Sequence, residues 1–458
     1  MAKRTKKKRQ RPVDANTRDL DSRDQADSES GSTAASTRRS TSSRSGRLKW
    51  AILGIVVSAV MIPAGIWAWD RHVRWQMKQA MSSRRFSEAE RWSTRGFWSP
   101  TPVRQTLLKA RIARLRMQPL KAELLLDEAD ETEQADADVD REMKLLAVQM
   151  GSPLGPAESQ RLLNENPDDT DAVFEAWVLG RLTFGDFESA RRLLEQWRRV
   201  EPDSALASYL FGQYHDLKDD NRHAEAAFAR AVRLDGRFDR ARLGWARSLY
   251  RLDRLKEAGA VADELLARDG NDADGLLLKS RILVDLEQFD QAIKLTRRAL
   301  NSVPTLYDAR FLLGKSLLAQ GRHAEAIETL SPILDRFAED NATLYLLAEA
   351  HKESGNEDEH RQFVRRYLDA QREIGRLYTA DASVRRQGSS GVTIDPSVLR
   401  DIGMRYVRVD WKSARDWLMR YSAQAPDDRE VLETLALIDE SLGELAVAED
   451  ARLAATEG

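Results

Sequence analysis

Residues 309–316 are the part of the chain that comes closest to a known catalytic motif. The run ARFLLGKS, from Ala309 to Ser316, fits a relaxed expression for a phosphate-binding loop. That chemistry needs a glycine-rich loop after a strand, because free backbone N–H groups must surround the phosphates. Here the apolar spacing predicts a helix, whose N–H groups are already used in helix hydrogen bonds. We therefore predict no nucleotide site at these residues.

The histidines are the next candidates for chemistry, as metal ligands. They are His72, His215, His223, His323, His351 and His360. None forms an H-x3-H or HExxH pair, the spacings that place two imidazoles on one face of a helix. His215 and His223 are eight residues apart with a carboxylate nearby, and we interpret all six as surface or partly packed side chains. The sequence predicts no metal site and no cofactor.

The composition argues against enzymatic chemistry and for helices. The chain has 458 residues and no cysteine, which excludes disulfides, cysteine-ligated zinc, iron–sulfur clusters and thiol catalysis. No G-x-S-x-G motif or Ser/His/Asp order supports nucleophilic hydrolysis. With 24 glycines, 13 prolines and 32% charged residues, long amphipathic helices are expected. We predict no catalytic residues, and a cryptic enzyme subunit remains an alternative.

The first 47 residues are predicted to be a disordered basic tail. Residues 1–49 contain 14 Lys and Arg against 6 Asp and Glu, with almost no large apolar side chain. Such a segment cannot bury enough apolar surface to offset its loss of conformational entropy. The cluster Lys6–Arg9 is interpreted as a topology signal, with binding to anionic lipid or to nucleic acid as alternatives. No aromatic residues are interleaved for base stacking, so no nucleic-acid partner is expected.

A membrane anchor is predicted at residues 48–70. Residues 50–69 carry no charge, and Trp50, Trp67 and Trp69 stand at the two ends. Twenty helical residues span about 30 Å, the thickness of the hydrocarbon layer. Indole rings favour the headgroup level, so this segment is predicted to contact membrane lipid. The excess of cations in the tail places the N-terminus in the cytoplasm and the body on the other side.

A pitch of 34 residues organises the rest of the chain. Small residues recur at Ala190, Ala224, Ala258, Ala292 and Ala326. After each of the first four, large or small side chains follow at fixed spacing, and then a proline or glycine twelve residues after the alanine. A second apolar stripe precedes each alanine, so every unit carries two amphipathic helices. Neither helix can bury its apolar face alone, and stacked units share one core.

This pattern resembles the tetratricopeptide-repeat (TPR) family, through these alanines, Trp177 and Trp245, Gly212 and Gly314, and Pro202 and Pro304. The resemblance implies an all-α, right-handed solenoid of helical hairpins behind the N-terminal transmembrane helix. Six tandem units are predicted over residues 171–374, preceded by divergent TPR-like helices over 71–170. A flexible insertion is predicted at 375–394, and further TPR-like helices at 395–458.

The resemblance also implies a concave groove lined by the first helix of each unit. Residues five and nine of each unit would face it, which places three cations in a line beside apolar side chains. The predicted partner-binding residues are Arg247, Arg281, Lys315, Leu243, Leu277, Phe311, Tyr209 and Tyr345. Such a ladder suits an extended peptide that carries carboxylates.

The predicted function is a membrane-anchored TPR scaffold that binds partner proteins or extended peptides for complex assembly or co-chaperone work. The alternatives are a cryptic enzyme subunit and a cytoplasmic or nucleic-acid-associated factor that uses the basic tail.

Overall fold

The computed structural model describes residues 64–82, 84–95, 102–131, 137–152, 161–164, 170–183, 185–389, 395–422, 425 and 428–442. Within these ranges the chain is helical or turns between helices, without a strand. The chain divides into residues 1–64 and 65–458, and the helices described are those of the second unit. The predicted tail and residues 48–63 of the predicted anchor lie outside the described residues. No described helix combines the length and the apolar character needed to cross a membrane.

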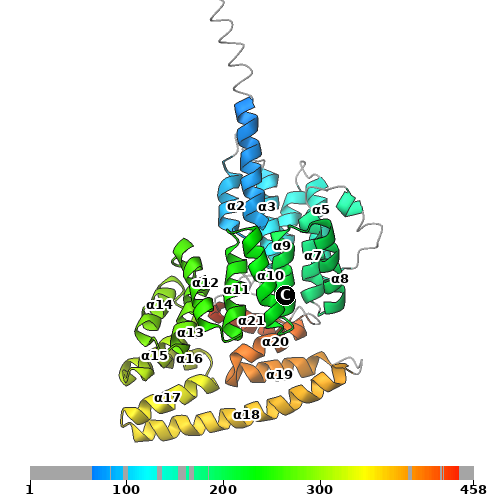
Figure 1. Ribbon diagram of the computed structural model, residues 1–458. Helices are drawn as coiled ribbons and strands as arrows, with labels where there is room; N and C mark the ends of the chain where they lie inside the picture. The colour runs from blue at the N-terminus through cyan, green and yellow to red at the C-terminus, as the bar shows by residue number, and fades with distance from the viewer. Residues whose placement is uncertain are drawn as a thin grey trace, which may run out of the picture. The chain divides into compact units, whose positions relative to one another are not determined.

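Six consecutive helix pairs form the centre of the second unit (Figure 1). The pairs are α7 (Thr170–Thr183) with α8 (Phe187–Val200), α9 (Ala205–Asp216) with α10 (Asn221–Leu234), α11 (Asp239–Arg251) with α12 (Leu255–Arg268), α13 (Ala273–Asp285) with α14 (Phe289–Ser302), α15 (Tyr307–Ala319) with α16 (His323–Arg336), and α17 (Asn341–Glu353) with α18 (Glu357–Ser389).

The turn inside each pair has one residue at positive φ, and this residue recurs with the repeat. The positions are Gly185, Asp219, Asp253, Glu287, Gly321 and Gly355, all 34 apart. The same geometry occurs earlier in the chain, at Arg84, Met117 and Gly151. A positive φ ends the first helix and reverses the chain within a few residues. The repeat therefore extends, in its turns, to the N-terminal side of the six regular pairs.

Helices on both sides of the six pairs complete the unit. Before them lie a helix over residues 64–82, α2 (Phe86–Ser93), α3 (Pro102–Leu115), α4 (Pro119–Asp130), α5 (Ala137–Gln149) and a helical turn at 161–164. After them lie α19 (Pro396–Val409), α20 (Trp411–Ser422) and α21 (Arg429–Leu442).

Close packing between helices explains the small residues of the repeat. The five alanines from Ala190 to Ala326 are all 0% exposed. The ring of Phe228, on α10, lies against the backbone of Gly212 in α9 and of Gly244 in α11. Small residues on the first helices thus leave the space that a large side chain of a second helix fills.

The structure corrects the prediction of a flexible insertion at 375–394. Helix α18 continues without interruption to Ser389, while residues 390–394 lie outside the described residues. Leu377 and Val384 are buried and belong to a core shared with α19 and α20. These two residues are seven apart, so they lie on one face of the helix, and their burial stabilises the segment despite its glycines and polar side chains.

Candidate partner-binding face

The first helices of the pairs form the inner face of the array. Each of α7, α9, α11, α13 and α15 contacts the next first helix along the chain, whereas contacts between consecutive second helices are sparse at most. The array therefore curves with its first helices on the inside. We define the inner face by the eight predicted residues, which lie on α9, α11, α13, α15 and α17. They are Tyr209, Leu243, Arg247, Leu277, Arg281, Phe311, Lys315 and Tyr345.

These eight residues differ in accessibility. Arg247, Lys315 and Tyr345 are exposed, and Leu243 is buried in the core between α11 and α12. The other four are half-buried. The side chains most available to a partner are therefore two cations, Arg247 and Lys315, and one aromatic residue, Tyr345. The Tyr345 hydroxyl donates a hydrogen bond to Glu349.

Two of the three cations in the predicted line are paired with carboxylates on the first helix of the following pair. Arg247 Nη2 lies 3.3 Å from Asp274 Oδ1, and Arg281 Nη2 lies 2.5 Å from Asp308 Oδ2. Each pair joins one first helix to the following one. Lys315 has no ion-pair partner among the described residues. The inner face thus presents alternating charges, and two of its cations stabilise the stacking of the repeats.

A segment of the chain itself already occupies the inner face at α15. Lys412, at the start of α20, forms an ion pair with Asp308, and its ammonium nitrogen lies 5.6 Å from the centre of the Phe311 ring. The adjacent Trp411 stacks on Phe337, with ring centroids 4.5 Å apart. The backbone also takes part, since Glu339 N donates to Arg408 O at 3.0 Å.

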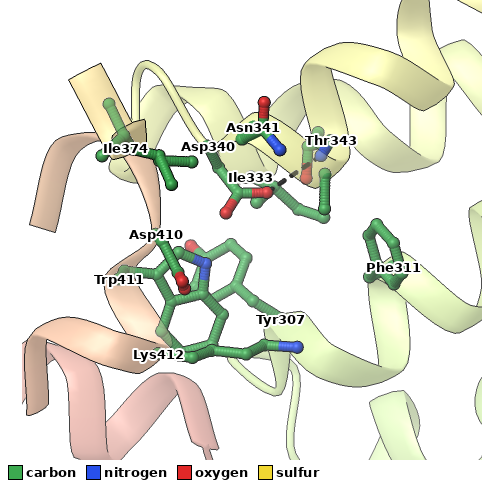
Figure 2. Close-up of a pocket in the computed structure, with 12 residues that line it drawn as sticks. Tyr307, Phe311, Ile333, Asp340, Asn341, Thr343, Ile374, Asp410, Trp411 and Lys412 are labelled. Carbon is green, nitrogen blue, oxygen red and sulfur yellow. Dashed lines mark hydrogen bonds between the residues drawn. The ribbon is translucent and has the colours of Figure 1, made fainter. Parts of the chain in front are cut away.

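A small cavity of about 190 Å³ remains beside this contact (Figure 2). Tyr307, Phe311, Asp340, Trp411 and Lys412 are among its lining residues. Burial raises the pKa of Asp340, although Thr343 N donates a hydrogen bond to its carboxylate at 2.9 Å.

Asp308, on α15, stays charged although it is buried. Burial alone would raise its pKa, but the positive charges of Lys412 and Arg281 outweigh burial and hold the pKa of Asp308 below its usual value. Asp308 is therefore a buried anion that two cations stabilise.

At the other end of the array, the N-terminal helices cover the inner face. Arg84, in the turn after the helix 64–82, forms a 2.6 Å ion pair with Glu175 of α7, and both side chains are nearly buried. Arg237, just before α11, lies 3.1 Å from Glu88 of α2. Sequence spacing did not indicate these contacts, because they join residues far apart in the chain.

A pair of carboxyl groups lies in a second cavity, of about 390 Å³, between the helix 64–82 and the loops before α9 and α11. Asp171 Oδ1 accepts hydrogen bonds from Trp197 Nε1 at 3.0 Å and from Ser204 Oγ at 2.9 Å. Burial and a hydrogen bond to Asp171 raise the pKa of Glu201 to about 7. Burial is the larger cause, and the hydrogen bond to Asp171 further favours the protonated form of Glu201.

The stretch that resembles a phosphate-binding loop lies inside α15, as predicted. Gly314 packs directly against Leu330, so the helix is held close to α16. Its N–H groups are used in the helix.

The fold defines the protein as an all-helical solenoid of TPR-like repeats. Two families of TPR type match its sequence. The tetratricopeptide-repeat family matches residues 317–380, and the family described as subunit 3 of the anaphase-promoting complex, or cyclosome, matches residues 255–333. No curated protein matches the chain in sequence.

Several solved structures are similar to part of the chain. PilW, described as a widely conserved type IV pilus biogenesis factor, is 19% identical, covers 43% of this chain and 90% of its own, and has a TM-score of 0.40. YrrB, described as a TPR protein with an unusual peptide-binding site, is 19% identical over 38% and 91%, with a TM-score of 0.35. MamA from Desulfovibrio magneticus RS-1 is 21% identical over 36% and 94%, with a TM-score of 0.34.

Proposed function

We propose that this protein is a non-enzymatic scaffold that holds segments of partner proteins against the inner face of its repeat array, and that residues 50–69 anchor it in a membrane. The observation that carries the first part is the docking of α20 on α15. Asp308 and Phe311 hold Lys412 there, beside the stacked ring of Trp411. The inner face is thus able to bind a helical segment through one buried carboxylate and aromatic contacts.

The chemistry of α20 suggests the kind of partner. A lysine next to an aromatic residue matches an acidic pocket with aromatic walls. Beyond α20, Lys315 lies one helical turn from Phe311 on the same side of α15, and it is exposed. A partner segment that continues along the array would meet Lys315 and then the alternating charges around Arg281 and Arg247. We therefore propose a partner segment with charges of both signs, and not only the carboxylates expected from the sequence.

Exposed tryptophans support the proposal of a membrane anchor. Trp67 and Trp75 are 60% and 55% exposed on the described helix 64–82, and Trp69 is 47% exposed. The guanidinium of Arg71 lies 5.4 Å from the centre of the Trp67 ring. Indole rings with adjacent cations are typical of a helix that leaves a bilayer through the headgroup layer. This arrangement directly follows the uncharged residues 50–66.

A capture experiment tests the scaffold. Full-length protein is cross-linked in native membranes and purified, either unchanged or with Lys315→Glu on the inner face. Lys294→Glu is the matched control, because Lys294 is an exposed lysine on the second helix α14. We expect a defined set of partners to be lost with Lys315→Glu and kept with Lys294→Glu. An equal partner set in both variants would contradict binding at the inner face.

Extraction and protease protection test the anchor. The full chain should stay with membranes in alkaline carbonate, and a variant lacking residues 48–70 should be released. Protease added to intact cells should degrade the repeat array and spare the basic tail. Release of the full chain by carbonate would refute the anchor, and degradation of the tail alone would refute the proposed orientation.

A further inference from the structure

Three side chains of metal-binding type meet at the turn between α9 and α10. His215 lies in the last turn of α9, Asp220 is the N-cap of α10, and His223 lies in the first turn of α10. The Nδ1 atoms of His215 and His223 lie 3.2 Å and 2.7 Å from the same oxygen, Oδ2 of Asp220. One ligating atom of each residue lies within 4.8 Å of the other two.

We propose that His215, Asp220 and His223 form a binding site for a divalent transition-metal ion of the Zn²⁺ type. Around a tetrahedral zinc ion with ligands at about 2.0–2.2 Å, neighbouring ligand atoms are about 3.3 Å apart. The distance of His215 Nδ1 from Asp220 Oδ2, 3.2 Å, matches that value. The distance of His223 Nδ1 from the same oxygen, 2.7 Å, would have to lengthen by about 0.6 Å, which a rotation of the exposed His223 side chain allows. Three protein ligands leave a fourth position open to water or to another ligand.

The proton positions permit this ligation. Each neutral imidazole carries one proton, and moving it from Nδ1 to Nε2 directs the Nδ1 lone pair towards the metal. Asp220 keeps its role as helix cap, because its other oxygen, Oδ1, accepts from His223 N while Oδ2 becomes the ligand. Lys218 is a nearby positive charge that would repel a bound cation. Its ammonium group is turned towards the Tyr214 hydroxyl, at 3.4 Å.

Two nitrogen ligands and one carboxylate select the class of metal. Imidazole suits Zn²⁺, Cu²⁺ and Ni²⁺, whereas Mg²⁺ and Ca²⁺ require sites made of oxygen ligands. Imidazole side chains are not required for the turn to fold. In the preceding pair the same turn is closed by Arg181, Asp186 and Ser189, through an ion pair and a helix cap.

Metal titration of the full chain tests the proposal. The protein is purified in detergent without a histidine tag, treated with chelator, and titrated calorimetrically with ZnCl₂. We expect one ion per chain, and a loss of affinity of at least about tenfold in His223→Ala. His323→Ala is the matched control and should bind as the unchanged protein does. Bound Co²⁺ should give the d–d absorption of a tetrahedral site, which His223→Ala should lack.

Asp220→Asn separates ligation from folding, because asparagine caps a helix as well as aspartate does. This variant should keep its melting temperature without metal and should bind Zn²⁺ more weakly. Absence of saturable Zn²⁺ binding would overturn the proposal, and so would equal binding by the unchanged protein and by His223→Ala. Equal affinity for Mg²⁺ would overturn the assigned class of metal.

Discussion

At the scale of single residues, the packing of Phe228 shows how the repeat depends on side-chain size. A methyl group built on Gly212 would lie 2.5 Å from Phe228 Cδ1, and one built on Gly244 would lie 2.8 Å from Phe228 Cε1. These distances are well inside van der Waals contact. Phe228 is 4% exposed and lies against both glycines, so an added methyl group would force the ring or the helices to shift.

Gly212→Ala should therefore destabilise the array by about 1–3 kcal/mol, the usual cost of overpacking. The matched control is Gly375→Ala in α18, where an added methyl group meets nothing within 4 Å. Alanine is the better helix former, so this control should raise stability by about 0.5–1 kcal/mol. Chemical denaturation measures both variants. A stable Gly212→Ala variant would show that the two helices are not as close as described.

The carboxyl pair of Glu201 and Asp171 predicts a pH dependence. The pKa of Glu201 is raised to about 7, so the folded state binds a proton that the unfolded state releases near pH 4.5. Stability linked to this proton is present at low pH and is lost as the pH rises from about 4.5 to 7. In Glu201→Gln the hydrogen bond to Asp171 no longer depends on pH. The melting temperature of the unchanged protein should therefore fall more between pH 5 and pH 8 than that of the variant. Equal falls would contradict the raised pKa.

At the scale of helices, α18 and α20 together close the C-terminal end of the array. Helix α18 supplies the buried Leu377 and Val384, and α20 supplies Trp411 to the same core. The ion pair of Lys412 with Asp308 joins residues 104 positions apart. The ion pair and the Trp411 ring stack thus add to the apolar burial of α20 and join this helix to α15.

Lys412→Glu should release α20 from α15, because it places a carboxylate beside the buried Asp308. Two like charges at a buried contact cost up to several kcal/mol. Position 412 is half-exposed, so screening by water reduces this repulsion. Amide hydrogen exchange in α19–α21 should become roughly tenfold faster or more, which corresponds to about 1.4 kcal/mol. Exchange in α9–α12 should not change. Lys294→Glu serves as the control, and unchanged exchange in α20 would show that Lys412 does not hold the helix in place.

At the scale of the whole array, the sequence predicted the repeat well because one physical requirement recurs. Each unit needs a small residue where helices approach closely, and the buried alanines keep that spacing from Ala190 to Ala326. The same regularity appears in the turns, where positive φ recurs from Gly185 to Gly355. The extension of these turns back to Arg84 was predicted only in outline, as divergent TPR-like helices over residues 71–170.

Contacts outside the repeat were not predictable from periodicity. Lys412 and Arg84 form ion pairs with residues of first helices, although both lie outside the six regular repeats. The ladder of Arg247 and Arg281 was recognised as a line of cations, but their carboxylate partners on the next helix were not. Asp274 and Asp308 stand 27 residues beyond these arginines, a spacing that has meaning only once the helices are stacked. The continuous helix at 375–389 was missed because its composition is typical of a loop.

The proposed function depends on the binding of partners to the inner face of the array. A photo-reactive amino acid placed at position 315 tests it most directly, with the same group at position 294 on the second helix α14 as control. Irradiation of cells should give discrete cross-linked partner species from position 315 and none of them from position 294. The same species from both positions, or species from position 294 alone, would contradict the account.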